Sequence, residues 1–171
     1  MNRSPAEVGS VPAPTLRPVV DGDQELLYRI YASTRTEELA PLPWDESTKD
    51  AFLRTQFGAQ DRYYRQTYPD ASYDVVLARD EPVGRLYVDR GARAVLIIDV
   101  ALLPPHRGRG IGTSLLTRLL DEARGVGKPV HVHVERFNPA RRLYQRLGFR
   151  QAADQGIYLL LERAAQPKTA S

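Results

Sequence analysis

A glycine-rich segment stands between an apolar run and a helical pattern in this sequence. Residues 107–113 read Arg-Gly-Arg-Gly-Ile-Gly-Thr; the run Ala94–Leu103 precedes them, and apolar residues at helical spacing follow. The start of a helix leaves about four backbone N–H groups without a partner, and its dipole favours negative charge. Glycines let the backbone curl tightly and approach a ligand. We therefore expect an anion site suited to a phosphate or pyrophosphate, with Arg107 and Arg109 adding positive charge.

Two common phosphate-binding motifs do not fit this segment. A P-loop needs Lys-Ser or Lys-Thr after its last glycine, whereas residues 111–113 read Ile-Gly-Thr. The dinucleotide-binding motif needs the spacing G-x-G-x-x-G. The glycines here stand at positions 108, 110 and 112, although Glu135 does end the next predicted strand. A third pattern, R/Q-x-x-G-x-G/A, is satisfied by Arg107, Gly110 and Gly112.

That third pattern is the pyrophosphate loop of the GNAT acetyltransferases, and the chain resembles this family from about residue 94 to residue 150. The apolar strand Val95–Leu103 resembles the strand before the loop, and Val130–Val134 resembles the strand that follows it. Asn138–Phe149 (NPARRLYQRLGF) is similar to the family's second signature, an Asn followed by a helix with Leu-Tyr that ends in Gly-Phe. The preceding part of the chain matches only in outline, as two helices and an antiparallel meander.

The resemblance implies that acetyl-CoA binds at these motifs. Backbone amides of Arg109 through Thr113 would hold the pyrophosphate. The strand edge near Val100–Leu102 would pair with the pantetheine arm where this strand splays from Val130–Val134, and an N–H there would polarise the thioester carbonyl. Asn138 matches a position that contacts the cofactor arm and also suits a plain helix N-cap; the two roles are compatible. The implied cofactor-binding residues are Val100, Leu102, Arg107, Gly108, Arg109, Gly110, Ile111, Gly112, Thr113 and Asn138.

Tyr144 is the proton donor that the resemblance implies. It matches the tyrosine that faces the thioester sulfur and protonates the leaving thiolate. A phenol with a pKa of about 10 is an adequate acid for a thiolate of comparable basicity. The alternative is that Tyr144 is a core aromatic residue on a short helix.

Asp99 is the first candidate for the base that deprotonates the acceptor amine. It is an acid inside the apolar run Val-Leu-Ile-Ile-Asp-Val-Ala, where a carboxylate is costly unless it lines a cavity or is paired. Some family members carry Glu-Asp at this place, and Ile98 here replaces the first acid of that pair. The alternative is a structural Asp that bonds to the backbone or to an arginine. Weaker candidates for the base are Glu37, Glu38, His133 and Glu135.

Two further groups of side chains are candidates for a site. His131 and His133 share a strand face, but without a third ligand we expect no metal. The acceptor side should be lined by the helical pair and an aromatic segment. The candidate wall residues are Trp44, Tyr63, Tyr64 and Tyr68, which would otherwise serve in core or loop packing.

The predicted elements place these motifs in one α/β (α+β) domain. We expect a strand at Leu16–Val19, a helix capped by Asp21 or Asp23, and a second helix capped by Asp45 or Ser47 that ends within Asp61–Asp70 and passes into a loop. An antiparallel meander follows, at Tyr73–Ala78, Val83–Val88 and Ala94–Leu103. Gly108–Gly112 then opens a helix that ends at Gly125–Gly127, the strand Val130–Val134 comes next, Pro139 begins a short helix, and Phe149–Ala152 and Gly156–Leu161 are strands. The resemblance implies a single-domain GNAT fold, with a central mixed, mostly antiparallel sheet, flanking helices and splayed strands that form the CoA cleft.

The domain is predicted to span residues 15–163, between an N-terminal tail (residues 1–14), rich in Pro, Ser, Gly and Ala, and a C-terminal tail (residues 164–171). The chain has 171 residues, no cysteine and a net charge of +3, too small to indicate nucleic acid by itself. Residues 101–150 carry 10 Lys or Arg against 3 Asp or Glu, so this part favours an anion. There is no apolar run of about 20 residues and no signal-peptide pattern. We expect a cytoplasmic protein that binds no membrane.

The functional hypothesis is an N-acyltransferase that moves an acetyl group from acetyl-CoA to a primary amine of a small molecule or peptide. Because no cysteine is present to carry an acyl group, we expect direct transfer. The alternatives are an acyl-CoA-binding sensor without turnover, and a nucleic-acid-binding protein with steeply salt-dependent affinity. The resemblance leaves the oligomeric state open between a monomer and a homodimer.

Overall fold

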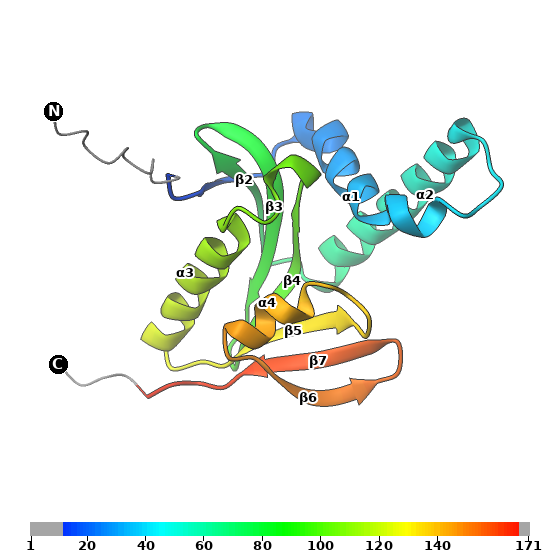
Figure 1. Ribbon diagram of the computed structural model, residues 1–171. Helices are drawn as coiled ribbons and strands as arrows, with labels where there is room; N and C mark the ends of the chain where they lie inside the picture. Colours follow the sequence, from blue (N-terminus) through cyan, green and yellow to red (C-terminus); the bar gives the residue numbers. More distant parts are fainter. Residues whose placement is uncertain (1–11, 168–171) are drawn as a thin grey trace, which may run out of the picture.

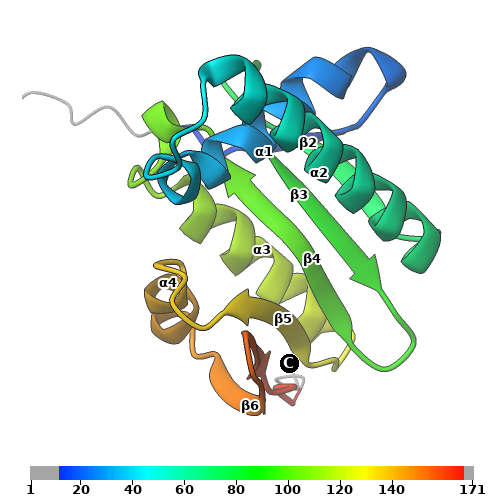
Figure 2. The ribbon, with the colours of Figure 1, turned by 90° about the vertical axis from the view of Figure 1, so that its right-hand side faces the viewer.

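A computed structural model describes residues 12–167. Its seven-stranded sheet has the order β1-β2-β3-β4-β5-β7-β6. Helices α1 and α2 cover one face and α3 the other, with α4 beside β5 (Figures 1 and 2). The elements are β1 (Thr15–Pro18), η1 (Asp21–Asp23), α1 (Gln24–Leu39), α2 (Glu46–Thr67), β2 (Ser72–Ala78), β3 (Glu81–Arg90), β4 (Val95–Leu102), η2 (Pro104–His106), α3 (Ile111–Gly125), β5 (Val130–Glu135), α4 (Arg141–Arg146), β6 (Arg150–Gln155) and β7 (Tyr158–Arg163).

The caps of the first two helices differ from each other. Asp45 caps α2 as predicted, since its carboxylate accepts from the Thr48 N–H at 2.7 Å. Asp23 was a predicted cap for α1, but its side chain makes no cap hydrogen bond. It accepts two hydrogen bonds from Arg17, at 2.7 and 2.8 Å, and so ties the turn before α1 to β1. Both carboxylate oxygens of Asp23 are therefore engaged outside α1.

Helix α2 ends at Thr67, within the aromatic, charged segment in which its end was predicted. The Tyr64 ring packs edge-on against Tyr87 at a centroid distance of 6.3 Å and holds this part of the helix on the sheet. The Tyr68 N–H bonds the Tyr64 carbonyl at 2.8 Å and closes the last turn. Packing on the sheet therefore supports a segment of weak helical periodicity.

The meander β2-β3-β4 is antiparallel, as predicted, and it contains a bulge next to the candidate base. Tyr87 lies opposite Asp99, but the following residue, Val88, lies opposite Ile97. Ile98 is therefore an extra residue in β4, which re-aims the side chains beyond it. Gly84 allows the two strands to approach closely, since a Cβ there would lie 2.3 Å from the Ala101 carbonyl oxygen.

Strands β4 and β5 are parallel and separate after a short contact. They pair only from Val95 opposite Val130 to Ile97 opposite Val132. Beyond that point β4 stays paired with β3 through Leu102, while β5 stays paired with β7 through Glu135. Figure 2 shows the two strands diverging toward their C-terminal ends. This is the predicted splay.

The elements of the second signature follow the prediction with one shift. Gly125 ends α3 as expected, but α4 begins at Arg141 rather than at Pro139. The Asn138 side chain accepts from the Ala140 N–H at 2.8 Å, so it closes the turn that leads into the helix. The regular helix is therefore confined to Arg141–Arg146. It ends before Gly148, which takes a left-handed φ of 85°.

The two faces of the sheet bury separate apolar cores. One core joins α3 and α4 to the sheet through residues such as Leu116, Ile97 and Tyr144. The other joins α1 and α2 to it through residues such as Leu27 and Tyr87. The sheet therefore lies between the helical pair of the first half of the chain and the helices α3 and α4 of the second half.

Residues 1–11 of the predicted N-terminal tail and residues 168–171 of the C-terminal tail lie outside the described part of the chain. Pro14 is buried, and its carbonyl accepts from Arg118 of α3 at 2.7 Å. Gln166 accepts from Arg124 at 2.9 Å. Among the described residues, no helix has both the length and the apolar character needed to cross a membrane.

Candidate active site

The glycine-rich loop presents a row of free backbone amides at the start of α3. Gly110 is the N-cap residue and has a left-handed φ of 83°. The first helical amide with a backbone acceptor is that of Ser114, which bonds the Gly110 carbonyl at 3.0 Å. Within residues 12–167, the amides from Gly108 to Thr113 have no acceptor. These are the amides that the sequence predicts for an anion.

The space around these glycines suits a bound group. A Cβ at Gly108 or Gly110 would meet nothing within 4 Å, so both face open space. Gly112 is different, because its Cβ would lie 3.5 Å from the Leu143 side chain of α4. Ile111 is buried and anchors the first turn of α3, while Thr113 is exposed. The loop therefore fits a diphosphate through its backbone.

Arg107 and Arg109 differ in their contacts. Arg107 turns back over the end of β4, where its Nε donates to the Leu102 carbonyl at 2.8 Å. Its Nη2 also donates to the Ser33 hydroxyl of α1 at 3.1 Å. Arg109 is exposed on the loop. Arg107 thus connects the loop to α1, a contact that sequence reasoning missed.

The edge of β4 that faces β5 is open beyond Ile97. The Leu103 N–H donates to the Val83 carbonyl of β3 at 2.8 Å. Main-chain groups alternate sides along a strand, so the amides of Val100 and Leu102 point away from β3, to the side that β5 has left. The structure therefore brings the predicted edge and the predicted loop together at one end of the splay.

Tyr144 is buried on α4 and reaches the same region from the α3 face. Its side chain is 3% exposed, and its ring packs edge-on against Phe149 at 5.3 Å. Burial raises the pKa of Tyr144 well above its usual value, and the charge of Asp99 raises it further. Both effects keep the hydroxyl protonated, as a proton donor must be, and both make it a weaker acid than a free phenol.

Asp99 lies under α2 in an ion pair. Its Oδ2 accepts from Arg85 Nη2 at 2.7 Å and from the Tyr64 hydroxyl at 3.4 Å. The Asp99 and Arg85 side chains are 15% and 3% exposed. The alternative role for Asp99, a pairing with an arginine, is therefore present, and it does not exclude a role at the cleft. Asp99 and Tyr144 approach the splay from opposite faces of the sheet.

The weaker candidates for the base are in other contacts. Glu38 and Glu135 both bind Arg35 of α1, at 3.0 and 3.3 Å. His133 lies 3.1 Å from Gln155 on the exposed side of β5. Glu37 is exposed on the last part of α1. His131, considered above as a metal ligand, lies 2.7 Å from Glu162.

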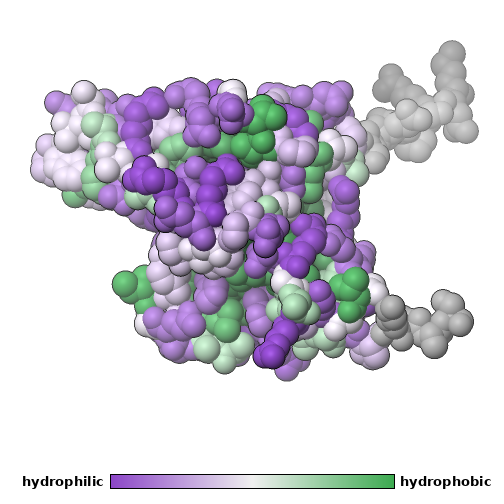
Figure 3. Space-filling view, turned by 180° about the vertical axis from the view of Figure 1, so that it is seen from behind, coloured by the Kyte–Doolittle hydropathy of each residue, from purple (hydrophilic) through white to green (hydrophobic). Residues whose placement is uncertain are grey.

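Of the four predicted wall residues, Tyr64 is the one that forms a hydrogen bond with Asp99. Trp44 packs edge-on against Phe52 at 5.4 Å on the α1–α2 side of the molecule. Tyr63 is 58% exposed, and the Tyr68 carbonyl accepts from the Tyr73 hydroxyl at 3.0 Å. Figure 3 shows two lobes, one formed by the α1–α2 connection and one by the β6–β7 hairpin, with an indentation between them.

Sequence reasoning missed Arg85, although a signal was present. Arg85 is the one charged residue in Val83–Val88, a run that is otherwise apolar or glycine. The argument that selected Asp99, a charge inside a buried strand, applies equally to Arg85. Gln60, which accepts from Arg85 Nη2 at 3.0 Å, carried no such signal.

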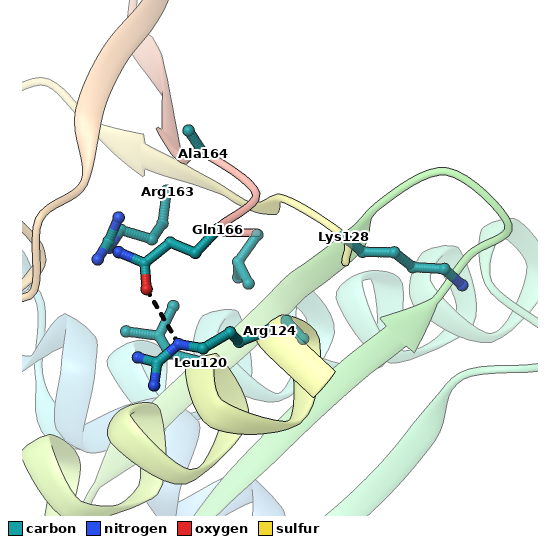
Figure 4. Close-up of a pocket in the computed structure, with 8 residues that line it drawn as sticks. Leu120, Arg124, Lys128, Arg163, Ala164 and Gln166 are labelled. Atoms are coloured by element: carbon teal, nitrogen blue, oxygen red, sulfur yellow. Dashed lines mark hydrogen bonds between the residues drawn. The ribbon is translucent and has the colours of Figure 1, made fainter. Parts of the chain in front are cut away.

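A small cavity lies away from these residues, beside the C-terminal end of α3. It has a volume of about 30 Å³ and is rimmed by Arg124, Lys128 and Arg163 (Figure 4). That volume holds about one water molecule. The cavity is too small for a nucleotide or an acceptor, and it includes no predicted site residue.

A family model described as "Acetyltransferase (GNAT) family" matches residues 27–149, which cover the helical pair, the meander, the loop and the second signature. This chain belongs to the GNAT family. The GNAT match begins within α1 and ends at Phe149, so it includes the weakly patterned first half as well as the two motifs.

Two relatives of known sequence support the GNAT assignment. The "L-amino acid N-acyltransferase MnaT" of Escherichia coli (strain K12) is 34% identical over 115 residues, which are 62% of this chain and 63% of that protein. The "L-methionine sulfoximine/L-methionine sulfone acetyltransferase" of Salmonella typhimurium is 46% identical over 61 residues, which are 34% of this chain and 36% of that protein. The matches thus span less than two thirds of either relative.

Solved structures share the GNAT fold. The PaiA N-acetyltransferase of Thermoplasma acidophilum, in complex with coenzyme A, superimposes with a TM-score of 0.68 at 17% identity, over 90% of this chain and 99% of that one. An acetyltransferase of Thermus thermophilus gives a TM-score of 0.64 at 24% identity, over 90% and 97% of the two chains. At this identity the likeness concerns the fold.

Proposed function

We propose that this chain is an N-acyltransferase that moves an acetyl group from acetyl-CoA to the primary amine of a small molecule or peptide. The observation that carries the proposal is the splay of β4 from β5 after Ile97, with unpaired β4 amides on one side and the free amides of the glycine-rich loop at its end. The proposal assigns this activity to one domain over residues 15–163.

The donor would be held mainly by backbone groups. The amides from Arg109 to Thr113 suit the diphosphate because they are free and stand at the positive end of the α3 dipole. The amides of Val100 and Leu102 would bind the pantetheine arm as a further strand would. Asn138 lies at the turn before α4, where its amide group can also contact this arm.

The chemical step is direct transfer between the two substrates. The amine nitrogen forms a bond to the acetyl carbon, and the bond from that carbon to the CoA sulfur breaks. The proton lost by the amine would pass to Asp99, and Tyr144 would donate its proton to the leaving thiolate. A β4 amide would stabilise the charge on the thioester oxygen. Holding both substrates at the splay supplies a large part of the rate.

The names of the relatives suggest where to look for the acceptor. Both names refer to amino acids or their analogues, so L-amino acids, methionine sulfoximine and methionine sulfone head a panel of amines that also includes polyamines and peptides. The donor panel compares acetyl-CoA with longer acyl-CoA species.

Release of free CoA thiol tests the function. The protein is incubated with acetyl-CoA and each amine, and the thiol is measured together with the acylated product. Turnover above the rate without protein is expected for at least one acceptor. Calorimetry with CoA is run in parallel: binding without turnover on any amine would favour an acyl-CoA sensor, and absence of binding by folded protein would refute the acyltransferase proposal.

A further inference from the structure

Arg85 is a buried charged residue to which the proposed transfer reaction gives no role. It lies in β3 with 2% of its surface exposed. Placing a guanidinium in a protein interior is costly unless it is paired and hydrogen-bonded. Its Nη2 meets this need by donating to Asp99 Oδ2 at 2.7 Å and to Gln60 Oε1 at 3.0 Å. Arg85 is therefore committed to the candidate base.

The contacts of Asp99 divide its two carboxylate oxygens. Oδ2 accepts from both Arg85 and Tyr64. Within residues 12–167, no donor bonds Oδ1. A carboxylate held by one oxygen has a fixed orientation and still has lone pairs for another partner. Oδ1 is thus the oxygen left for an acceptor amine or for a water next to it.

Stability alone does not explain this cluster. A buried ion pair is often no more stabilising than apolar residues of similar volume. Two further polar atoms here, Arg85 Nε and the Tyr87 hydroxyl, are buried without a partner among the described residues. Each such group costs about 1–3 kcal/mol. Apolar side chains would avoid these costs, which indicates that the charges serve the site.

Among the described residues that face Asp99, Arg85 is the one that carries a positive charge. The other titratable groups there are Tyr87 from β3, Tyr64 from α2 and Tyr144 from α4. Burial raises the pKa of all three tyrosines, that of Tyr87 to about 12, so they are neutral near pH 7. The ionic contact that fixes the carboxylate therefore comes from Arg85.

We propose that Arg85 is a positioning residue, which holds the Asp99 carboxylate oriented with Oδ1 free for the acceptor amine. This inference rests on the proposed acyltransferase function. It assigns Arg85 no contact with either substrate, so its effect should appear in turnover rather than in CoA affinity.

Substitution of Arg85 tests the inference with the best acceptor from the panel. Arg85→Met should lower kcat by about 10²-fold or more, in line with the loss of general base catalysis, and leave the Kd for CoA within about threefold. Arg85→Lys keeps the charge and the ionic contact and should restore part of the rate.

The same change elsewhere on β3 gives a matched control. Arg90 is half-exposed and pairs with Glu122 of α3. Arg90→Met should leave kcat as in the wild type. The double variant Arg85→Met/Asp99→Leu separates the site from folding, because it removes both charges together: it should melt at or above the wild-type temperature and show no more turnover than Arg85→Met.

The outcomes separate the inference from the function on which it rests. A wild-type protein that binds CoA but acylates no amine contradicts the proposed function. A wild-type protein with turnover, whose Arg85→Met variant keeps the rate, contradicts the positioning role alone. So does a double variant that is much less stable than the wild type, since it would make the pair a structural one.

Discussion

At the scale of single residues, the environment divides the roles of the two predicted catalytic groups. Tyr144 is enclosed by apolar residues, and burial raises its pKa. Asp99 lies among polar partners, in an ion pair with Arg85. A proton donor must be protonated at the pH of the reaction, and the environment of Tyr144 favours that state.

Tyr144→Phe tests the proton-donor role. The variant loses only the hydroxyl, so the Kd for CoA should stay within about threefold, while kcat should fall by about 10²-fold or more. Steady-state kinetics and calorimetry measure the two effects. Tyr28→Phe is the control, because Tyr28 is also a buried tyrosine, but its hydroxyl bonds Asp50 between α1 and α2; it should lower stability and not kcat. Unchanged turnover in Tyr144→Phe would remove this residue from the mechanism.

At the scale of elements, the loop before α3 depends on backbone shape more than on side chains. Gly110 takes a left-handed conformation at the N-cap and faces open space. Its role is to turn the chain so that successive amides point the same way. Of the two arginines in this segment, Arg107 binds the end of β4 and α1 with its side chain.

Gly110→Asp should abolish CoA binding, because it adds bulk and negative charge beside the amides that would hold the diphosphate. Gly127→Asp is a matched control: Gly127 also has a left-handed φ, of 67°, and open space around it, but it lies at the other end of α3. Both variants carry the same backbone strain, of about 1–2 kcal/mol. Calorimetry with CoA should therefore separate them, and equal affinity in both would refute the loop assignment.

At the scale of the whole molecule, α1 is tied to both of the strands that separate. Ser33 accepts from Arg107 next to the end of β4, and Arg35 binds Glu135 at the end of β5 at 3.3 Å. These contacts link the face that would carry the acceptor with the strands that would carry the donor. The edge strand β1 is fixed separately, because Arg17 of β1 forms an ion pair with Asp23 in the turn before α1.

The ion pair between Arg17 and Asp23 predicts that part of the free energy of unfolding is lost in acid. The hydrogen bonds from Arg17 hold the pKa of Asp23 below its usual value. The pair therefore stabilises the fold above the ordinary pKa of an aspartate, and this contribution disappears as the pH falls through the lowered value. Asp23→Asn should cost about 1–3 kcal/mol at pH 7 and much less at an acidic pH below the lowered pKa of Asp23, as measured by urea unfolding. Asp21→Asn, an exposed neighbour, should change little at either pH; an equal loss at both pH values for Asp23→Asn would contradict this account.

The sequence by itself determined the elements and the two motifs. Helices and strands were predictable wherever apolar spacing and turn residues are local signals, as in α3 and in the meander, and Gly110 and Gly112 identified the loop. The local signals were insufficient where a tertiary contact decides: Asp23 pairs with Arg17 instead of capping α1.

Only the tertiary structure decided which groups meet at the splay. Asp99 could be recognised as an unusual buried acid, but its partner Arg85 is on the neighbouring strand and Tyr64 is on a distant helix. The bulge at Ile98, which sends Asp99 to the α2 face, has no clear signal in the residues around it. The partner of a buried charge is set by strand register and packing between elements, and both depend on contacts that no single stretch of sequence contains.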